Sequence, residues 1–291
     1  MVIVKIMGGL GNQLFQYSAG RQLACILRTE LKLDISWFRD QSVRKYSLSH
    51  FNVRENFASP EEVLKLTVVG EGFLRNLLRK LLGRTSNPIR KHVRERHYHF
   101  DPDIFRLHGD LYLNGYWQSE KYFKDIESVI REDLTFKNPL PPNDSEYAQL
   151  LANCNSVSLH VRRGDYVKGS SSNKIHALCD ETYYHSSASF IGAKTKHPHF
   201  FIFSDDTYWV RANLSLPFPM TIIERDEPTQ DFEDLRLMGF CKHHIIANSS
   251  FSWWGAWLNP DPGKIVVTPK RWFSKPDFST KDLIPPGWIQ L

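Results

Sequence analysis

Two adjacent arginines follow an apolar stretch in the second half of the chain and are suited to bind an anion. They lie in His160-Val161-Arg162-Arg163-Gly164-Asp165-Tyr166, directly after an apolar run at 157–161. Such a run predicts a buried strand, and open α/β sheets bind ligands beyond the carboxyl ends of their strands. Arginine carries a permanent charge and a planar fork of donors that matches phosphate. The segment therefore predicts a phosphate site, and an ion pair between an arginine and Asp165 is the structural alternative.

A glycine-rich turn near the N-terminus is a second candidate site. Gly8-Gly9-Leu10-Gly11-Asn12-Gln13 lies between a predicted strand at 2–6 and a predicted helix. Gly9 and Gly11 let the backbone approach a ligand, although a purely structural role in strand-to-helix packing is the alternative. A dinucleotide fingerprint is incomplete because its third glycine is missing, even though Asp34 ends the next predicted strand, where a ribose-binding acid would stand. The two amides of the turn suit sugar hydroxyl groups instead.

A serine-rich segment precedes a predicted helix at 250–258. Serine and asparagine are preferred helix N-caps, and their hydroxyls and the N–H groups of the first turn are suited to bind a diphosphate. Plain capping, with Trp253 and Trp254 in the core, is the alternative. The candidate residues are Asn248, Ser249, Ser250, Phe251 and Ser252.

The acidic pair after the phenylalanine-rich run at 200–203 is a fourth candidate. In Ser204-Asp205-Asp206, one carboxylate could accept hydrogen bonds from the N1 and N2 groups of guanine. The adjacent pair is not the Asp-x-Asp pattern of metal-dependent sugar transferases. Asp101-Pro102-Asp103 has that spacing but is typical of a helix start. We therefore predict no metal site and no cofactor.

Composition limits the classes of partner. The 291 residues suit one large domain or two of half that length. With 37 basic and 32 acidic residues, the net charge of +5 favours an anionic small molecule or a membrane surface, and predicts no nucleic-acid partner. Four widely spaced cysteines, no signal peptide and no long apolar stretch predict a cytoplasmic protein with reduced thiols.

Alternating strands and helices are predicted for most of the chain. The pattern is regular after residue 156 and again over the first 35 residues, which predicts α/β layers built on parallel sheets with helices on both faces. The segment Asn138–Asp144, with three prolines, is the predicted boundary. We therefore expect domains at 1–145 and 146–291. Residues beyond 55 in the first half show no regular pattern.

Three motifs in order resemble glycosyltransferase family 11, the α-1,2-fucosyltransferases of bacterial type. They are the turn and helix start at 8–17, the arginine segment at 160–166 and the serine segment at 248–254. The resemblance implies an α/β protein of the GT-B fold, with two Rossmann-like domains facing a cleft. The first would be the acceptor side and the second the GDP-sugar donor side, with the extreme C-terminus as a candidate to pack back on the first domain.

The resemblance also implies a function and roles. It implies inverting transfer of L-fucose from GDP-fucose to the 2-hydroxyl of a galactose-terminated oligosaccharide, with no metal required. Arg162 would hold the β-phosphate and Asn12 would reach the fucose, as the catalytic pair. Donor-binding residues would be His160, Arg162, Arg163, Asp165, Asp205, Asn248, Ser249, Ser250, Phe251, Ser252, Gly9 and Gly11. Transfer to another linkage, or nucleotide-sugar binding without catalysis, remain the alternatives, and no general base is identified.

Residues 72–84 form a basic amphipathic stretch. Apolar residues share one helical stripe and arginines and lysines lie off it, which is typical of a helix at a membrane interface. Peripheral contact with the inner face of a membrane is one interpretation. We favour an ordinary helix that buries its stripe in the first domain.

Overall fold

A computed structural model describes residues 1–67, 91–164, 178–224, 231–274 and 279–291. The chain divides into two compact units, Met1–Lys137 and Asn138–Leu291. Asp165 and the amphipathic stretch at 72–84 lie outside the described residues. Among the described helices, none has both the length and the apolar character that crossing a bilayer requires.

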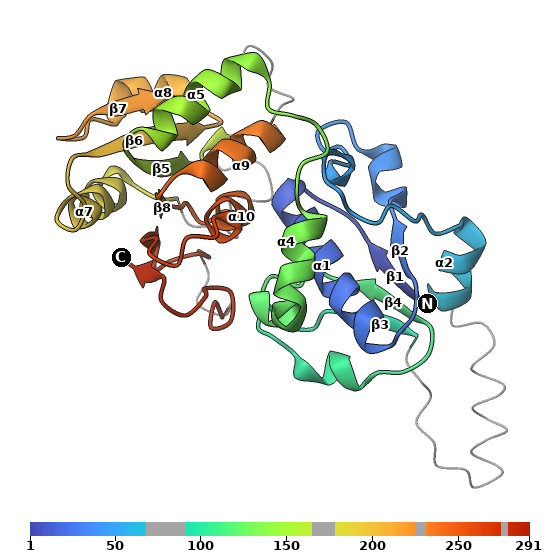
Figure 1. Ribbon diagram of the computed structural model, residues 1–291. Coiled ribbons are helices and arrows are strands. Elements are labelled where there is room, and N and C mark those ends of the chain that lie inside the picture. The colour runs from blue at the N-terminus through green and yellow to red at the C-terminus, as the bar shows by residue number, and fades with distance from the viewer. Residues whose placement is uncertain (68–90, 165–177, 225–230, 275–278) are drawn as a thin grey trace, which may run out of the picture. The chain divides into compact units, whose positions relative to one another are not determined.

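The second unit is built on a parallel sheet of six strands in the order β10-β9-β8-β5-β6-β7 (Figure 1). From β5 the chain adds β6 and β7 on one side, and it then adds β8, β9 and β10 on the other side. The strand order therefore reverses between β5 and β8, although all the strands are parallel. Ligands of open α/β sheets bind at such a switch point. The strands are β5 (Asn155–Val161), β6 (Pro198–Ser204), β7 (Met220–Ile222), β8 (His243–Ile245), β9 (Val266–Thr268) and β10 (Ile289–Gln290).

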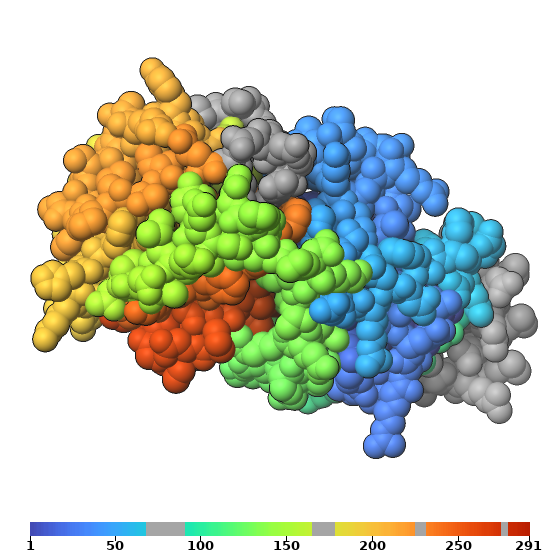
Figure 2. Space-filling view, turned by 45° about the horizontal axis from the view of Figure 1, so that its top comes forward, coloured from blue at the N-terminus to red at the C-terminus, as the bar shows by residue number. Residues whose placement is uncertain are grey.

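Alternating side chains of β6 explain why helices cover both faces of this sheet. Successive side chains of a strand point to opposite faces. Phe200 and Ile202 join one core with α7 (Glu181–Gly192) and α8 (Thr207–Asn213). Phe201 and Phe203 join another with α5 (Pro142–Ala152) and α9 (Asp231–Phe240), and α10 (Ser250–Leu258) packs on α9. Figure 2 shows α5, in light green, at the surface of this unit. The predicted parallel sheet with helices on both faces is confirmed.

The first unit has a parallel sheet in the order β2-β1-β4-β3. Ile3 packs with Leu66 on one face, whereas Val4 meets α1 on the other, so closely that a Cβ on Gly20 would lie 2.2 Å from Val4 Cγ2. The elements are β1 (Val2–Lys5), α1 (Leu10–Ile26), β2 (Leu31–Asp34), α2 (Pro60–Thr67), β3 (His92–Arg94), β4 (Leu111–Asn114) and α4 (Glu127–Asp133), with short 3-10 helices η1 (Ser36–Asp40), η2 (Leu48–His50), η3 (Pro102–Arg106), η4 (Glu120–Tyr122) and η5 (Lys124–Ile126).

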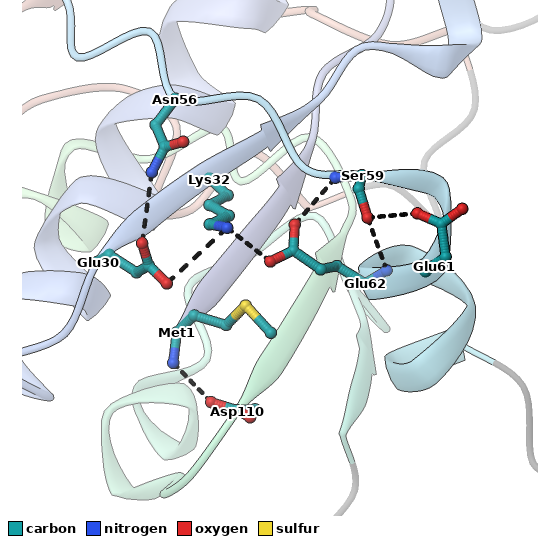
Figure 3. A network of polar contacts seen from close by, with 8 residues as sticks. All are labelled: Met1, Glu30, Lys32, Asn56, Ser59, Glu61, Glu62 and Asp110. Atoms are coloured by element: carbon teal, nitrogen blue, oxygen red, sulfur yellow. Dashed lines mark hydrogen bonds and ion pairs between the residues drawn. The ribbon is translucent and has the colours of Figure 1, made fainter.

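Charged groups tie the amino ends of these strands together (Figure 3). Lys32 Nζ lies 2.5 Å from Glu62 Oε1, which joins β2 to α2, and the other oxygen of Glu62 accepts the N–H of Ser59. The N-terminal ammonium group of Met1 pairs with Asp110 at 2.6 Å, directly before β4. This edge of the sheet is thus occupied by structural ion pairs.

One detail differs from the expectations. Pro142 begins α5, so the proline-rich segment enters a helix instead of remaining a linker, and proline is favoured at the first helical position because its missing N–H costs nothing there. The strand β10 pairs with β9, so the C-terminal end is part of the second sheet. By contrast, the predicted helix start at Asp101 is confirmed, because its side chain accepts the N–H of Asp103.

Candidate functional site

An arginine and an aspartate meet beyond the carboxyl ends of β5 and β6. These strands pair in register, with His160 opposite Phe203 and Val161 opposite Ser204, so the next residues, Arg162 and Asp205, also face each other. Arg162 Nη1 lies 2.8 Å from Asp205 Oδ2, and the arginine side chain keeps 21% of its exposure. Arg162 is therefore paired with Asp205, whereas the alternative partner Asp165 lies outside the described residues.

The Asp205 carboxylate also holds the loop that carries the arginines. Its Oδ1 accepts the backbone N–H of Arg163 at 2.9 Å, and a Cβ on Gly164 would lie 2.8 Å from Oδ2. Burial acts to raise the pKa of Asp205, but the Arg162 charge and the N–H groups of Arg163 and Gly164 outweigh it and lower the pKa. An ionised Asp205 thus fixes the position of Arg162.

Arg163 braces the same loop from the other side. Its guanidinium carbon stacks 4.1 Å from the centre of the Trp209 ring, and its Nε lies 3.7 Å from Asp206 Oδ2. Asp206 in turn caps α8 by accepting the N–H of Trp209. Of the two arginines, Arg163 is therefore held against α8, and its role in donor binding stays a prediction.

His160 is buried behind Arg162 and next to α10. The residue is 5% exposed, and the centre of its ring lies 5.7 Å from that of Phe251. Burial, together with the Arg162 charge and against the pull of Asp205, lowers its pKa to about 3. The imidazole is therefore neutral at physiological pH, and its buried Nδ1 makes no hydrogen bond within the part of the chain that the structure describes.

The serine segment serves first as a helix cap. Ser249 Oγ accepts the N–H of Phe251, and Ser252 is 1% exposed. Asn248 is equally buried, and its side chain donates to the carbonyl of Trp272 at 2.9 Å and accepts from the Cys179 thiol. Trp253 and Trp254 lie in the core, as the capping alternative predicts. Ser249, Ser250 and Phe251 remain half-buried at the first turn of α10.

The glycine-rich turn follows β1 in the first unit. Gly8 has φ +78°, and a Cβ there would lie 2.8 Å from Asn12 Nδ2, so this position requires glycine. Gly9 is the N-cap of α1, and Gly11 is buried in its first turn. Arg44, which sequence analysis missed, places its Nη1 3.9 Å from the position of a Cβ on Gly9.

The two amides of this turn differ. Gln13 is fully buried; its Nε2 donates to the carbonyls of Gly8 and Lys45, and its Oε1 accepts the N–H of Ser47. The prediction of a sugar-binding amide is therefore wrong for Gln13, which fastens the segment at 45–47. Asn12 is half-buried, and its Oδ1 accepts from Gln118 Nε2 at 2.7 Å. Gln118 comes from the region in which the sequence showed no motif.

Asp34, the candidate for ribose, is also structural. It is 4% exposed, and its oxygens accept the Tyr112 hydroxyl at 2.6 Å and the N–H of Ser36 at 2.9 Å. Within the described ranges, no three His, Cys, Asp or Glu side chains gather as metal ligands.

Two α/β units with parallel sheets define the class, the GT-B type of glycosyltransferase fold. The sequence model of Glycosyl transferase family 11 matches residues 1–291, and the chain belongs to this family. The resemblance carried by the three motifs is thus confirmed for the family and the fold.

Two bacterial relatives match almost the whole chain. An "Alpha-1,2-colitosyltransferase" of Escherichia coli is 31% identical over 100% of this chain and 99% of its own, and "O-antigen biosynthesis glycosyltransferase WbnK" of Escherichia coli is 31% identical over 98% and 99%. "Galactoside alpha-(1,2)-fucosyltransferase 2" of Sus scrofa is 25% identical over 73% and 64%.

Solved structures support the fold alone. A mutant of Arabidopsis thaliana FUT1 in complex with GDP has a TM-score of 0.53 at 10% identity, covering 91% of this chain and 69% of that one. The α-1,6-fucosyltransferase NodZ from Bradyrhizobium, co-crystallised with GDP, has a TM-score of 0.50 at 15% identity, covering 89% and 92%.

Proposed function

We propose that this glycosyltransferase moves L-fucose from GDP-fucose to the 2-hydroxyl of a galactose-terminated oligosaccharide, with inversion and without a metal ion. The observation that carries the proposal is Arg162, held by Asp205 at the switch point of the second sheet. The second unit, Asn138–Leu291, would bind the donor, and the first unit, Met1–Lys137, would bind the acceptor.

The charge of the leaving group explains the role of Arg162. The bond from fucose C1 to the β-phosphate oxygen breaks, its electron pair stays with GDP, and the acceptor oxygen bonds to C1 as its hydroxyl proton leaves. Negative charge therefore grows on the diphosphate, and a fixed guanidinium offsets it without a metal. The Asp205 carboxylate preorganises that guanidinium, so little reorganisation is needed during the reaction.

Neighbouring groups complete the donor site in this proposal. Neutral His160 offers a ring nitrogen for a ribose or guanine contact, and the first turn of α10 offers Ser249 and Ser250 to the diphosphate. The ring contact between His160 and Phe251 places this turn beside the end of β5. Asp205 as a guanine ligand stays a prediction.

One relative favours a second donor. The Escherichia coli colitosyltransferase matches the whole chain at 31% identity, whereas the mammalian galactoside fucosyltransferases match less of it at 24–26%. Colitose is L-fucose without its 3-hydroxyl group. GDP-activated colitose is therefore the alternative donor, with the same leaving group and the same demand on Arg162.

Paired transfer assays test this function. The protein is incubated with GDP-fucose or GDP-colitose and lactose, once with EDTA and once with Mg²⁺ or Mn²⁺, and the product linkage is determined by NMR. We expect an α-1,2-linked product at equal rates with EDTA and with metal. Transfer that disappears with EDTA and returns with Mn²⁺ would refute the metal-free mechanism, and a different linkage would refute the regiochemistry.

A further inference from the structure

The first sheet has its own switch point, between β1 and β4. From β1 the chain continues to β2 on one side, whereas β4 and β3 lie on the other. Two loops leave the carboxyl ends of β1 and β4, and the hydrogen bond from Gln118 Nε2 to Asn12 Oδ1 joins them. A second bond, from buried Gln16 Nε2 to the carbonyl of Gly115, fixes the start of the β4 loop on α1. This is where an open α/β sheet binds its ligand.

The β4 loop is held by one carboxylate. Glu95 follows β3; its Oε2 accepts the N–H of Tyr116 at 2.7 Å and its Oε1 that of Trp117 at 2.9 Å. A Cβ on Gly115 would lie 2.4 Å from Glu95 Cβ, so the glycine lets the two segments touch. Both oxygens of Glu95 are thus engaged in fixing two successive residues of the loop.

The loop has an unusual backbone that this clamp maintains. Trp117 has φ +56°, which is rare for a bulky residue, and such conformations concentrate at functional sites. The N–H of Ser119 bonds to the carbonyl of Trp117 at 2.8 Å, which places Gln118 at the tip of a tight turn. Burial alternates: Gly115, Trp117 and Ser119 are buried, whereas Tyr116 and Gln118 reach the surface.

The groups presented there suit a neutral sugar. Burial, together with Glu95, raises the pKa of Tyr116, and burial, Tyr116 and Glu95 raise that of Tyr98, so both phenols stay protonated. Two amides and two phenols offer donors and acceptors for hydroxyl groups, and the rings offer flat apolar faces. This edge differs from the arginine site, where the fixed charges suit a diphosphate.

We propose that Gly115–Gln118 forms the acceptor-sugar subsite, in which Gln118 and Tyr116 contact the hexose and Glu95 acts as a positioning residue. This inference rests on the proposed function and adds to it a place and residues for acceptor recognition.

Steady-state kinetics with GDP-fucose and lactose test the proposal. We expect Gln118→Ala to raise the KM for lactose about fivefold to tenfold, the loss of one hydrogen bond, with the KM for GDP-fucose and the affinity for GDP unchanged. Gln149→Ala, on the exposed face of α5, is the matched control and should change neither constant.

The positioning role has a separate readout. Glu95→Gln keeps the side-chain size but replaces one of the two acceptor oxygens by an NH2 group, which cannot accept a hydrogen bond from the loop backbone. The KM for lactose should therefore rise, while the affinity for GDP, measured by calorimetry, stays constant. Glu62→Gln, a half-buried glutamate that also accepts a backbone N–H, is its control. Equal losses of lactose and GDP affinity in Glu95→Gln would show a merely structural role and overturn the assignment.

Different results would refute the proposed function and the acceptor subsite. A wild-type protein that transfers fucose to no galactoside contradicts the proposed function. Wild-type transfer combined with an unchanged lactose KM in both Gln118→Ala and Tyr116→Phe contradicts the acceptor subsite alone.

Discussion

The carboxyl edges of the two sheets carry opposite kinds of chemistry. At the second sheet, Arg162 and Asp205 form an ion pair beside a buried neutral histidine. At the first sheet, Asn12 and Gln118 form an amide pair beside a loop that a glutamate holds through backbone N–H groups. Each edge includes the switch point of a parallel sheet, so each of the two sheets offers a place where ligands of this fold class bind. The side chains at that place then decide which ligand binds.

The largest effect should come from Arg162. We expect Arg162→Ala to lower kcat by a factor of about 10² to 10³, because the growing charge on the diphosphate loses its fixed partner. Arg162→Lys should recover little, since the planar fork is lost. Transfer rates from GDP-fucose measure this. Arg211→Ala, in an exposed ion pair on α8, is the control. Near-normal turnover of Arg162→Lys would remove the contrast between the two edges.

Asp205 should give the next largest effect. Asp205→Asn keeps an acceptor for the N–H of Arg163 but removes the charge that faces Arg162, so kcat/KM for the donor should fall about 10-fold to 100-fold. The affinities of Asp205→Asn for GDP and for IDP, which lacks the 2-amino group, separate positioning of Arg162 from contact with guanine. Equal losses of affinity for both nucleotides assign Asp205 to positioning Arg162, and a loss confined to GDP assigns the guanine contact. No loss for either would contradict both.

His160 should make stability depend on pH. Its folded pKa of about 3 lies below the ordinary value of 6.5, so the unfolded chain binds more protons below pH 6.5 and stability falls as the pH falls. We expect the stability difference between wild type and His160→Gln to shrink by about 2 kcal/mol from pH 7 to pH 5. Urea unfolding at both pH values measures this. A difference independent of pH would mean that His160 keeps its ordinary pKa in the folded protein.

Tyr112 should give the smallest effect, and its substitution tests whether Asp34 in the first sheet has a structural role. Tyr112→Phe removes the hydrogen bond to Asp34 and should cost about 1.5 kcal/mol of unfolding free energy, with kcat/KM unchanged. Thermal unfolding and transfer rates measure the two. A drop in kcat/KM without loss of stability would return Asp34 to the candidates for ligand binding.

Prediction from the sequence succeeded where a motif and a regular pattern coincided. The apolar run at 157–161 and the phenylalanine run at 200–203 formed the neighbouring strands β5 and β6, and the arginines followed the first of them as expected. It missed β3, β4, β10, α2, α4, α5 and α8. The strand His92–Arg94 has a single apolar residue and none that is buried, so no apolar run marks it, and α5 begins inside a proline-rich segment.

The sequence by itself determined the family, the parallel α/β class and the presence of an arginine at a strand end, because residue type and local spacing encode these. Only the tertiary structure decided that Asp205 is the partner of Arg162, that Gln13 and Asp34 are structural, and that Gln118 meets Asn12 across 106 positions. The reason is that strand order places distant residues at one sheet edge, and no local pattern records which strands become neighbours.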